Sequence, residues 1–170
     1  MDFANFEKLK CVKLADSRLS DIVNFAFPDS LDVLDLSKSY ITSIEGVKFP
    51  KILVSLNPSS NFPRSIAGVQ FPPTLRRPNL NIILINAGDI QKSNLHENFH
   101  IETLYLGGQD KIDFSCCMLL ENLHSLSLCH CIASNSYRFG HKLKSLQIEY
   151  CDYTNGMSIG ECFNLKYLYI

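Results

Sequence analysis

One six-residue pattern, Leu-x-x-Leu-x-Leu, recurs along almost the whole chain. Its clear copies begin at Leu9, Leu31, Ile101, Leu123, Leu143 and Leu165. Where two clear copies are adjacent, their starts lie 22, 22, 20 and 22 residues apart. One such unit holds a single half-buried strand and cannot bury its apolar face alone. The copies are therefore predicted to stack into a solenoid with one continuous core.

Each unit continues from the strand motif through a small or polar ninth residue and an apolar residue near position eleven. In the second unit this pattern predicts seven inward side chains: Leu31, Leu34, Leu36, Ile41, Ile44, Val47 and Phe49. A Phe-Pro pair recurs at residues 27–28, 49–50 and 71–72. It is predicted to close the turn before the next strand, because proline fixes φ and ends any helix.

The short repeat length leaves little room for an α-helix on the return path of each unit. The convex side of the early units is therefore predicted to consist of short 3₁₀ turns and extended segments. A longer helical turn is predicted for residues 114–123, whose sequence is FSCCMLLENL.

The third and fourth units are irregular. The third, beginning at Leu53, has Pro58 at the inward sixth position, which predicts a short or distorted strand. The fourth has two registers: a start at Leu75 keeps the spacing of 22 but uses Pro78 as a core residue, whereas a start at Leu80 matches every apolar position. The start at Leu80 is favoured because the hydrophobic pattern sets register. Residues 76–78 would then belong to a five-residue insertion on the convex side or rim.

These units resemble the leucine-rich repeat family, in eight copies that cover nearly the full chain. The first units are similar to the 22-residue class of a protein phosphatase 1 regulatory subunit, as in ITSIEGV at residues 41–47. Later units, with Cys131 and Cys151 at position nine, are similar to the cysteine-bearing class common in F-box adaptors. The Pro-x-Ser/Thr-Leu spacing at Pro28 and Pro72 is also similar to amoebal FNIP repeats, whose Phe-Asn motif is absent.

The resemblance implies an α/β leucine-rich-repeat solenoid as a single domain over residues 1–170. It would be a right-handed coil with a parallel β-sheet on its concave face and short 3₁₀ or extended segments on its convex face. The family's usual asparagine at position nine is mostly replaced, so we expect less uniform packing and lower stability. The residues at this position are Ser17, Ser39, Asn61, Gly88, Gln109, Cys131 and Cys151.

The cysteines at position nine, Cys131 and Cys151, are interpreted as inward thiols that bond to loop carbonyls in place of asparagine. A zinc site built with Cys129 and His130 is the alternative, since thiolate and imidazole both suit zinc. Position seven faces solvent while position nine faces the core, however, so the side chains of Cys129 and Cys131 should diverge.

Composition limits the environment and the partners of the chain. Lysine and arginine total 16 against 17 acids, without the basic stripe that nucleic-acid binding requires. No apolar run has the length of a signal peptide or a membrane span. The seven cysteines include no C-x-x-C pair, which favours reduced thiols. We expect a cytoplasmic protein, with the nucleus as second option, that binds no nucleic acid, membrane or cofactor.

Two short strings match catalytic motifs but lie in the wrong context. His96-Glu97-x-x-His100 matches the zinc-protease pattern, which requires both histidines on one helix, yet a repeat strand begins directly afterwards. Residues 156–160 match G-x-S-x-G, but no histidine follows to complete a hydrolase triad. The histidines are interpreted as rim residues and the glycines as turn formers, so we expect no enzymatic activity.

The expected function is that of a protein-interaction scaffold which binds a partner on its concave face. Strand side chains alternate, so positions three, five, seven and eight are predicted to face that side. Tyrosines on a rigid sheet are favoured interface anchors. The predicted binding residues are Tyr105, Ser125, Ser127, His130, Gln147, Glu149, Tyr150, Tyr167 and Tyr169. Substrate recognition for a ubiquitin ligase, which would need an F-box ahead of the repeats, is the alternative; a zinc metalloprotease is a distant one.

The last unit is expected to be incomplete. Its strand motif ends at Ile170, at the third inward position, so nothing turns back over Leu165 and Leu168. Open solenoid ends expose core and leave strand edges unpaired. We therefore expect a truncated product, a segment of a longer array, or a chain that associates with itself through this end.

Overall fold

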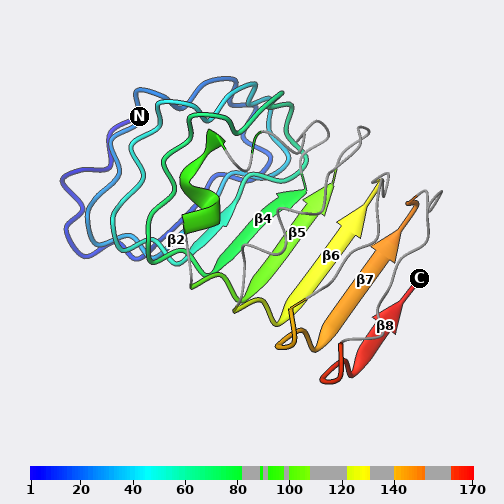
Figure 1. Ribbon diagram of the computed structural model, residues 1–170. Coiled ribbons are helices and arrows are strands. Elements are labelled where there is room, and N and C mark those ends of the chain that lie inside the picture. Colours follow the sequence, from blue (N-terminus) through cyan, green and yellow to red (C-terminus); the bar gives the residue numbers. More distant parts are fainter. Residues whose placement is uncertain (82–88, 90–91, 98–99, 108–121, 131–139, 152–161) are drawn as a thin grey trace.

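The computed structural model describes residues 1–81, 89, 92–97, 100–107, 122–130, 140–151 and 162–170. These residues form a β-solenoid whose eight strands make one parallel sheet in sequence order. Figure 1 shows the coils stacked side by side, with the N-terminus in the first coil and the C-terminus at β8. The strands are β1 (Cys11–Lys13), β2 (Val33–Asp35), β3 (Ser55–Asn57), β4 (Arg77–Asn81), β5 (Thr103–Gly107), β6 (Ser125–Cys129), β7 (Ser145–Glu149) and β8 (Tyr167–Tyr169). The predicted solenoid with a single parallel sheet is thus confirmed.

The inward strand positions form one continuous core. In the second unit the six aliphatic side chains predicted to point inward are at most 5% exposed, while Phe49 is half-buried. In the other units the fourth and sixth positions are buried as well, except that Leu14 of the first unit is half-buried and the last unit is exposed. This prediction is confirmed for Leu34, Leu36, Leu104, Leu106, Leu126, Leu128, Leu146 and Ile148, all of which are at most 2% exposed. Leu168 in β8, the last strand of the sheet, is 43% exposed.

A tight turn precedes the strands, and the Phe-Pro pairs build it as predicted. The carbonyl of Pro28 accepts a hydrogen bond from Leu31 N at 3.1 Å, and Pro50 and Pro72 do the same for the next two units at 3.1 and 3.0 Å. The same turn forms without proline before Leu143, where Gly140 supplies the carbonyl at 3.1 Å. The three-residue spacing of this hydrogen bond therefore matters more than the proline itself.

Outside the strands the early coils are made of turns and extended segments, as predicted. At Gly46 and Gly68 the chain has φ of 75° and 77°, which glycine adopts without steric cost. The only helical element with bounds in the described part is the 3₁₀ helix η1 (Asn94–Glu97). None of the helices in the described residues is long and apolar enough to cross a membrane. The helical turn predicted for residues 114–123 lies outside the described residues apart from its last two.

The predicted register of the fourth unit is wrong. Leu56 of β3 pairs with Pro78, and Leu80 pairs with Leu106, so the unit starts at Leu75 and not at Leu80. Residues 76–78 run into strand β4 rather than forming an insertion. The physical reason is that an inward position requires an apolar side chain, which proline has. The missing N–H of proline removes one hydrogen bond from the ladder, but the ring still packs in the core.

The third strand is short, as predicted, but it is not distorted. It has three residues, as do β1 and β2, and Asn57 stays in register with Asp35. In earlier coils the sixth residue donates to the next coil, as Leu36 N does to Asn57 O at 2.8 Å. The buried Pro58 has no N–H for this bond. The β3–β4 ladder consequently has two paired residues, fewer than its neighbours.

In three of the described units the side chain at position nine links its coil to the preceding one. The Nδ2 of buried Asn61 donates to Leu36 O at 2.7 Å, where Leu36 is the sixth residue of the preceding unit. Ser39 Oγ donates to Leu14 O at 3.4 Å, and Cys151 Sγ donates to Leu128 O at 3.8 Å, in the equivalent positions. The interpretation of Cys151 as a substitute for asparagine is confirmed, and Cys131 lies outside the described residues.

Position eight has a shared backbone conformation that the sequence pattern did not reveal. In five units this residue has a φ between 52° and 57°, in the left-handed region. Non-glycine residues adopt it at a cost of about 1–2 kcal/mol. All five side chains are exposed. The residues are Asp16, Lys38, Ser60, His130 and Tyr150.

Replacing Asn61 with alanine should destabilise the solenoid by about 2–4 kcal/mol, because it leaves buried main-chain groups without partners. The Asn61 side chain donates to the carbonyls of Leu36 and Pro58 and accepts from Ile41 N. Urea unfolding measures the change. Asn57→Ala, in the partly exposed strand β3, is the matched control and should cost less than half as much. Equal losses in the two variants would contradict the structural role of position nine.

Replacing Lys38 with glycine should stabilise the protein by about 0.5–1 kcal/mol, because glycine relieves the left-handed strain. The exposed Lys13, in strand β1, offers the opposite case, since glycine in a strand costs about 0.5–1 kcal/mol. Thermal unfolding of Lys38→Gly and Lys13→Gly should move the midpoint in opposite directions. A loss of stability in both variants would show that φ at position eight carries no strain.

Candidate binding surface

The outward strand positions of the C-terminal half form a tyrosine-rich surface. Tyr105 of β5 and Tyr167 and Tyr169 of β8 are 41%, 57% and 57% exposed. Between them lie Ser125 and Ser127 of β6, whose side chains are small and half-buried. Tyrosines at the two sides of this surface therefore flank a low polar floor.

Strand register places the predicted binding residues in defined rows. At position five, Tyr105 pairs with Ser127, Ser127 with Gln147, and Gln147 with Tyr169. Three strand intervals of about 4.8 Å separate the two tyrosines of this row by about 14 Å. Position three contributes a parallel row that includes Ser125 and ends at Tyr167. The residues chosen from the alternation pattern thus share one face of β5 to β8.

The ends of β6 and β7 bring a second group of predicted residues together. The rings of His130 and Tyr150 stack with centroids 5.0 Å apart and an angle of 10°. His130 N donates to Glu149 O at 3.0 Å, and Gln147 Nε2 donates to Glu149 Oε1 at 2.7 Å. Tyr150 is nevertheless 80% exposed. The paired left-handed residues therefore project a stacked aromatic group from the rim of the sheet.

Cys129 lies in this group at the end of β6. Partial burial raises the pKa of its thiol above the ordinary value, and the nearby Glu149 carboxylate and Cys151 raise it further. A raised pKa keeps the sulfur protonated at neutral pH, and metal binding needs the thiolate. Among the described residues there is no group of three or more histidine, cysteine or acidic side chains placed to hold a metal ion.

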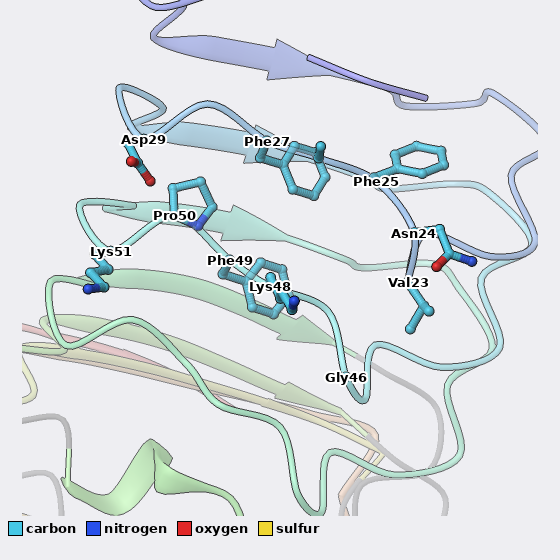
Figure 2. Close-up of a pocket in the computed structure, with 11 residues that line it drawn as sticks. Val23, Asn24, Phe25, Phe27, Asp29, Gly46, Lys48, Phe49, Pro50 and Lys51 are labelled. Carbon is cyan, nitrogen blue, oxygen red and sulfur yellow. The ribbon is translucent and has the colours of Figure 1, made fainter. Parts of the chain in front are cut away.

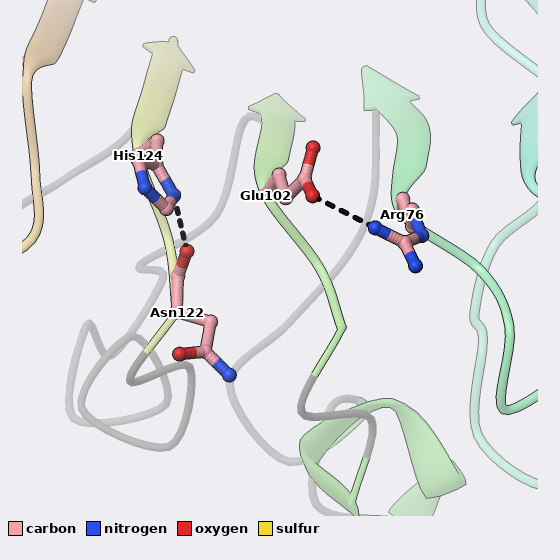
Figure 3. Close-up of polar contacts among 4 residues, drawn as sticks. All are labelled: Arg76, Glu102, Asn122 and His124. Carbon is pink, nitrogen blue, oxygen red and sulfur yellow. Dashed lines mark hydrogen bonds and ion pairs between the residues drawn. The ribbon is translucent and has the colours of Figure 1, made fainter.

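The opposite ends of the strands have a charged row, which Figure 3 shows at the start of β4 to β6. Arg76 Nη1 lies 3.0 Å from Glu102 Oε1, with both side chains nearly half exposed. Beside them, His124 Nδ1 lies 2.7 Å from Asn122 O. Exposed pairs of this kind contribute little to stability. Because these side chains lie at the starts of the strands, they form a polar border to the tyrosine-rich surface.

The two strings that match catalytic motifs acquire no catalytic geometry in the described residues. The 3₁₀ helix η1 has four residues and ends at Glu97, so His100 lies outside it. The zinc-protease motif needs two histidines one turn apart on a single α-helix. Glu97 and His100 are exposed, as rim residues would be. The G-x-S-x-G string at residues 156–160 lies outside the described residues.

A groove lies on the lateral side of the first two coils, which sequence reasoning did not find. This lateral groove runs between residues 23–29 and residues 46–51 and has a volume of about 590 Å³. Figure 2 shows Phe25 and Phe27 from one coil above Phe49 from the next, with Lys48 next to Phe49 and Lys51 farther along, past Pro50. The repeated Phe-Pro pairs were a usable signal, because rings repeated at one position must line one side of the stack.

Comparison with known proteins gives no family assignment. A scan against protein-family models finds no match, and a search of curated proteins finds none either. The function has to be argued from the surfaces themselves.

Replacing Glu149 with glutamine should speed alkylation of Cys129 at pH 8 by up to about fivefold. The substitution removes the carboxylate charge that raises the pKa of the thiol, so a larger fraction becomes thiolate. Iodoacetamide labelling followed by mass spectrometry of the Cys129 peptide measures the rate. Glu45→Gln, on an exposed turn, is the matched control and should leave the rate unchanged. A slower reaction in Glu149→Gln would contradict the assigned cause of the shift.

Proposed function

We propose that this chain is a protein-binding solenoid of leucine-rich repeat type, which binds a protein partner on the concave face of its C-terminal half. The observation that carries the proposal is the exposure of four tyrosines on one region of a rigid sheet. Tyr105, Tyr150, Tyr167 and Tyr169 are 41%, 80%, 57% and 57% exposed. Exposed tyrosines bury apolar area on binding while their hydroxyls keep a hydrogen-bond partner.

The chemistry around the tyrosines favours a protein over a polyanion. Serine and glutamine side chains occupy the floor, and Glu149 is the acid at its rim. Nucleic-acid binding would require cationic side chains directed at phosphates. A neutral surface of aromatic and hydroxyl groups suits a protein surface with mixed apolar and polar atoms.

Assignment to leucine-rich repeats rests on two features that recur in the described units. The Leu-x-x-Leu-x-Leu motif supplies the inward residues of one parallel strand per coil. The side chain at position nine donates to the carbonyl at position six of the preceding unit, as in Asn61 and Cys151. The asparagine and the cysteine in the same role are consistent with the two repeat classes that the units resemble.

The test uses the double variant Tyr105→Ser with Tyr150→Ser. A partner isolated from the source cells with the wild-type protein should bind the purified double variant at least about tenfold more weakly, since buried tyrosines dominate such interfaces. Tyr40→Ser is the matched control, because Tyr40 is 55% exposed but lies outside the tyrosine-rich surface. Isothermal calorimetry measures both affinities, and circular dichroism verifies folding.

Loss of binding in the double variant alone is the expected result. Equal affinity of the wild type and the double variant for the partner would reject the concave face of β5 to β8 as its site. Equal weakening by Tyr40→Ser would reject it as well, because the effect would then not be local.

A further inference from the structure

The main chain of Phe27 has unused hydrogen-bonding capacity in the lateral groove. The preceding residue, Ala26, donates from N to Met1 O at 3.3 Å and accepts at O from Phe3 N at 2.8 Å. Successive residues of an extended chain direct their N–H and C=O groups to opposite sides. Those of Phe27 therefore point away from the N-terminal segment, toward the second coil. Within the described part of the chain, no hydrogen bond satisfies them.

The third coil shows what such a position binds. Phe71 has the same place in the repeat as Phe27, two units later, next to a proline. Its N–H donates to Asn94 Oδ1 at 2.6 Å, and its C=O accepts from Asn94 Nδ2 at 2.9 Å. One carboxamide thus satisfies both main-chain groups of a single residue. An amide group, as in a peptide backbone, is the chemical match for the same two groups of Phe27.

The side chains of the lateral groove indicate which ligand side chains should lie next to that amide. The rings of Phe25, Phe27 and Phe49 are half-buried, and the first two lie 6.1 Å apart. They form an apolar floor open to solvent. The exposed side chains of Lys48 and Lys51 also line the groove. Neither ammonium group forms an ion pair within the described residues. The groove therefore complements an apolar side chain with a carboxylate close to it.

At the turn of Gly46 the second coil approaches the first, at one end of the lateral groove. With φ of 75° this position strongly favours glycine, and an added Cβ would lie 3.6 Å from Val23 Cγ2.

We propose that the lateral groove binds an extended peptide segment of a partner protein by strand addition. The partner's backbone pairs with the N–H and C=O of Phe27. An apolar side chain of the segment packs on the three phenylalanine rings, and an acidic side chain lies between Lys48 and Lys51. Main-chain hydrogen bonds supply affinity in this mode and side-chain pockets supply specificity. The site is separate from the concave face and does not depend on it.

Selection from a library of random seven-residue peptides displayed on phage, with the wild-type protein immobilised, tests the proposal. Enriched peptides should carry an acidic residue within two positions of an apolar one. Fluorescein-labelled copies of them should bind the double variant Lys48→Glu with Lys51→Glu at least about tenfold more weakly, because reversal of both charges repels the carboxylate. Lys144→Glu with Lys166→Glu makes the same charge change at exposed positions elsewhere and should leave affinity unchanged.

Amide hydrogen exchange tests the backbone pairing. Exchange of the Phe27 amide should be fast in the free protein and slow at least about tenfold when a selected peptide is bound. The Ala26 amide, already bonded to Met1 O, should change less. Failure to enrich any peptide, equal binding to the Lys48→Glu, Lys51→Glu variant, or an unaffected Phe27 amide would overturn the proposal. Unchanged peptide binding to Tyr105→Ser with Tyr150→Ser separates this site from the concave face.

Discussion

Hydrogen bonds between successive coils are the interaction on which the rest of this structure depends. A coil with one strand of three to five residues satisfies few of its own main-chain groups, and buried groups without partners are costly. Hydrogen bonds of the strand ladder satisfy part of these main-chain groups. In three described units the side chain at position nine adds a further hydrogen bond beyond the end of the strand, as Asn61 Nδ2 does to Leu36 O. The order of the sheet, and hence the placement of every exposed side chain, follows from this stacking.

Sequence reasoning predicted the core well because inward positions tolerate few residue types. Leu34, Leu104 and Leu146 could be placed from spacing alone, and each is fully buried. The fourth unit was predicted incorrectly because a start at Leu80 matches every apolar position, whereas the actual start at Leu75 requires Pro78 as a core residue. The turn from Pro72 to Leu75, with its hydrogen bond of 3.0 Å, repeats the turns of the two preceding units and was the better guide.

Some surface features were likewise predictable from the sequence and others were not. Alternation along a strand predicted which side chains of β5 to β8 face outward, including Tyr105 and Tyr169. It did not predict the left-handed conformation at position eight, because Lys38 and Tyr150 are not residues that favour positive φ. The lateral groove was also beyond it, since that groove forms between two coils rather than along one. Rigid stacking thus produces two separate surfaces from one repeat.

All eight strands form one uninterrupted sheet, and the pairing of β3 with β4 has the fewest paired residues among β2 to β5. Nuclear Overhauser contacts test this pairing directly. Contacts are expected between the side chains of Leu56 and Pro78, and between Leu80 and Leu106, as their pairing requires. Contacts of Leu56 with Ile83 instead, as a unit starting at Leu80 would give, would contradict this pairing.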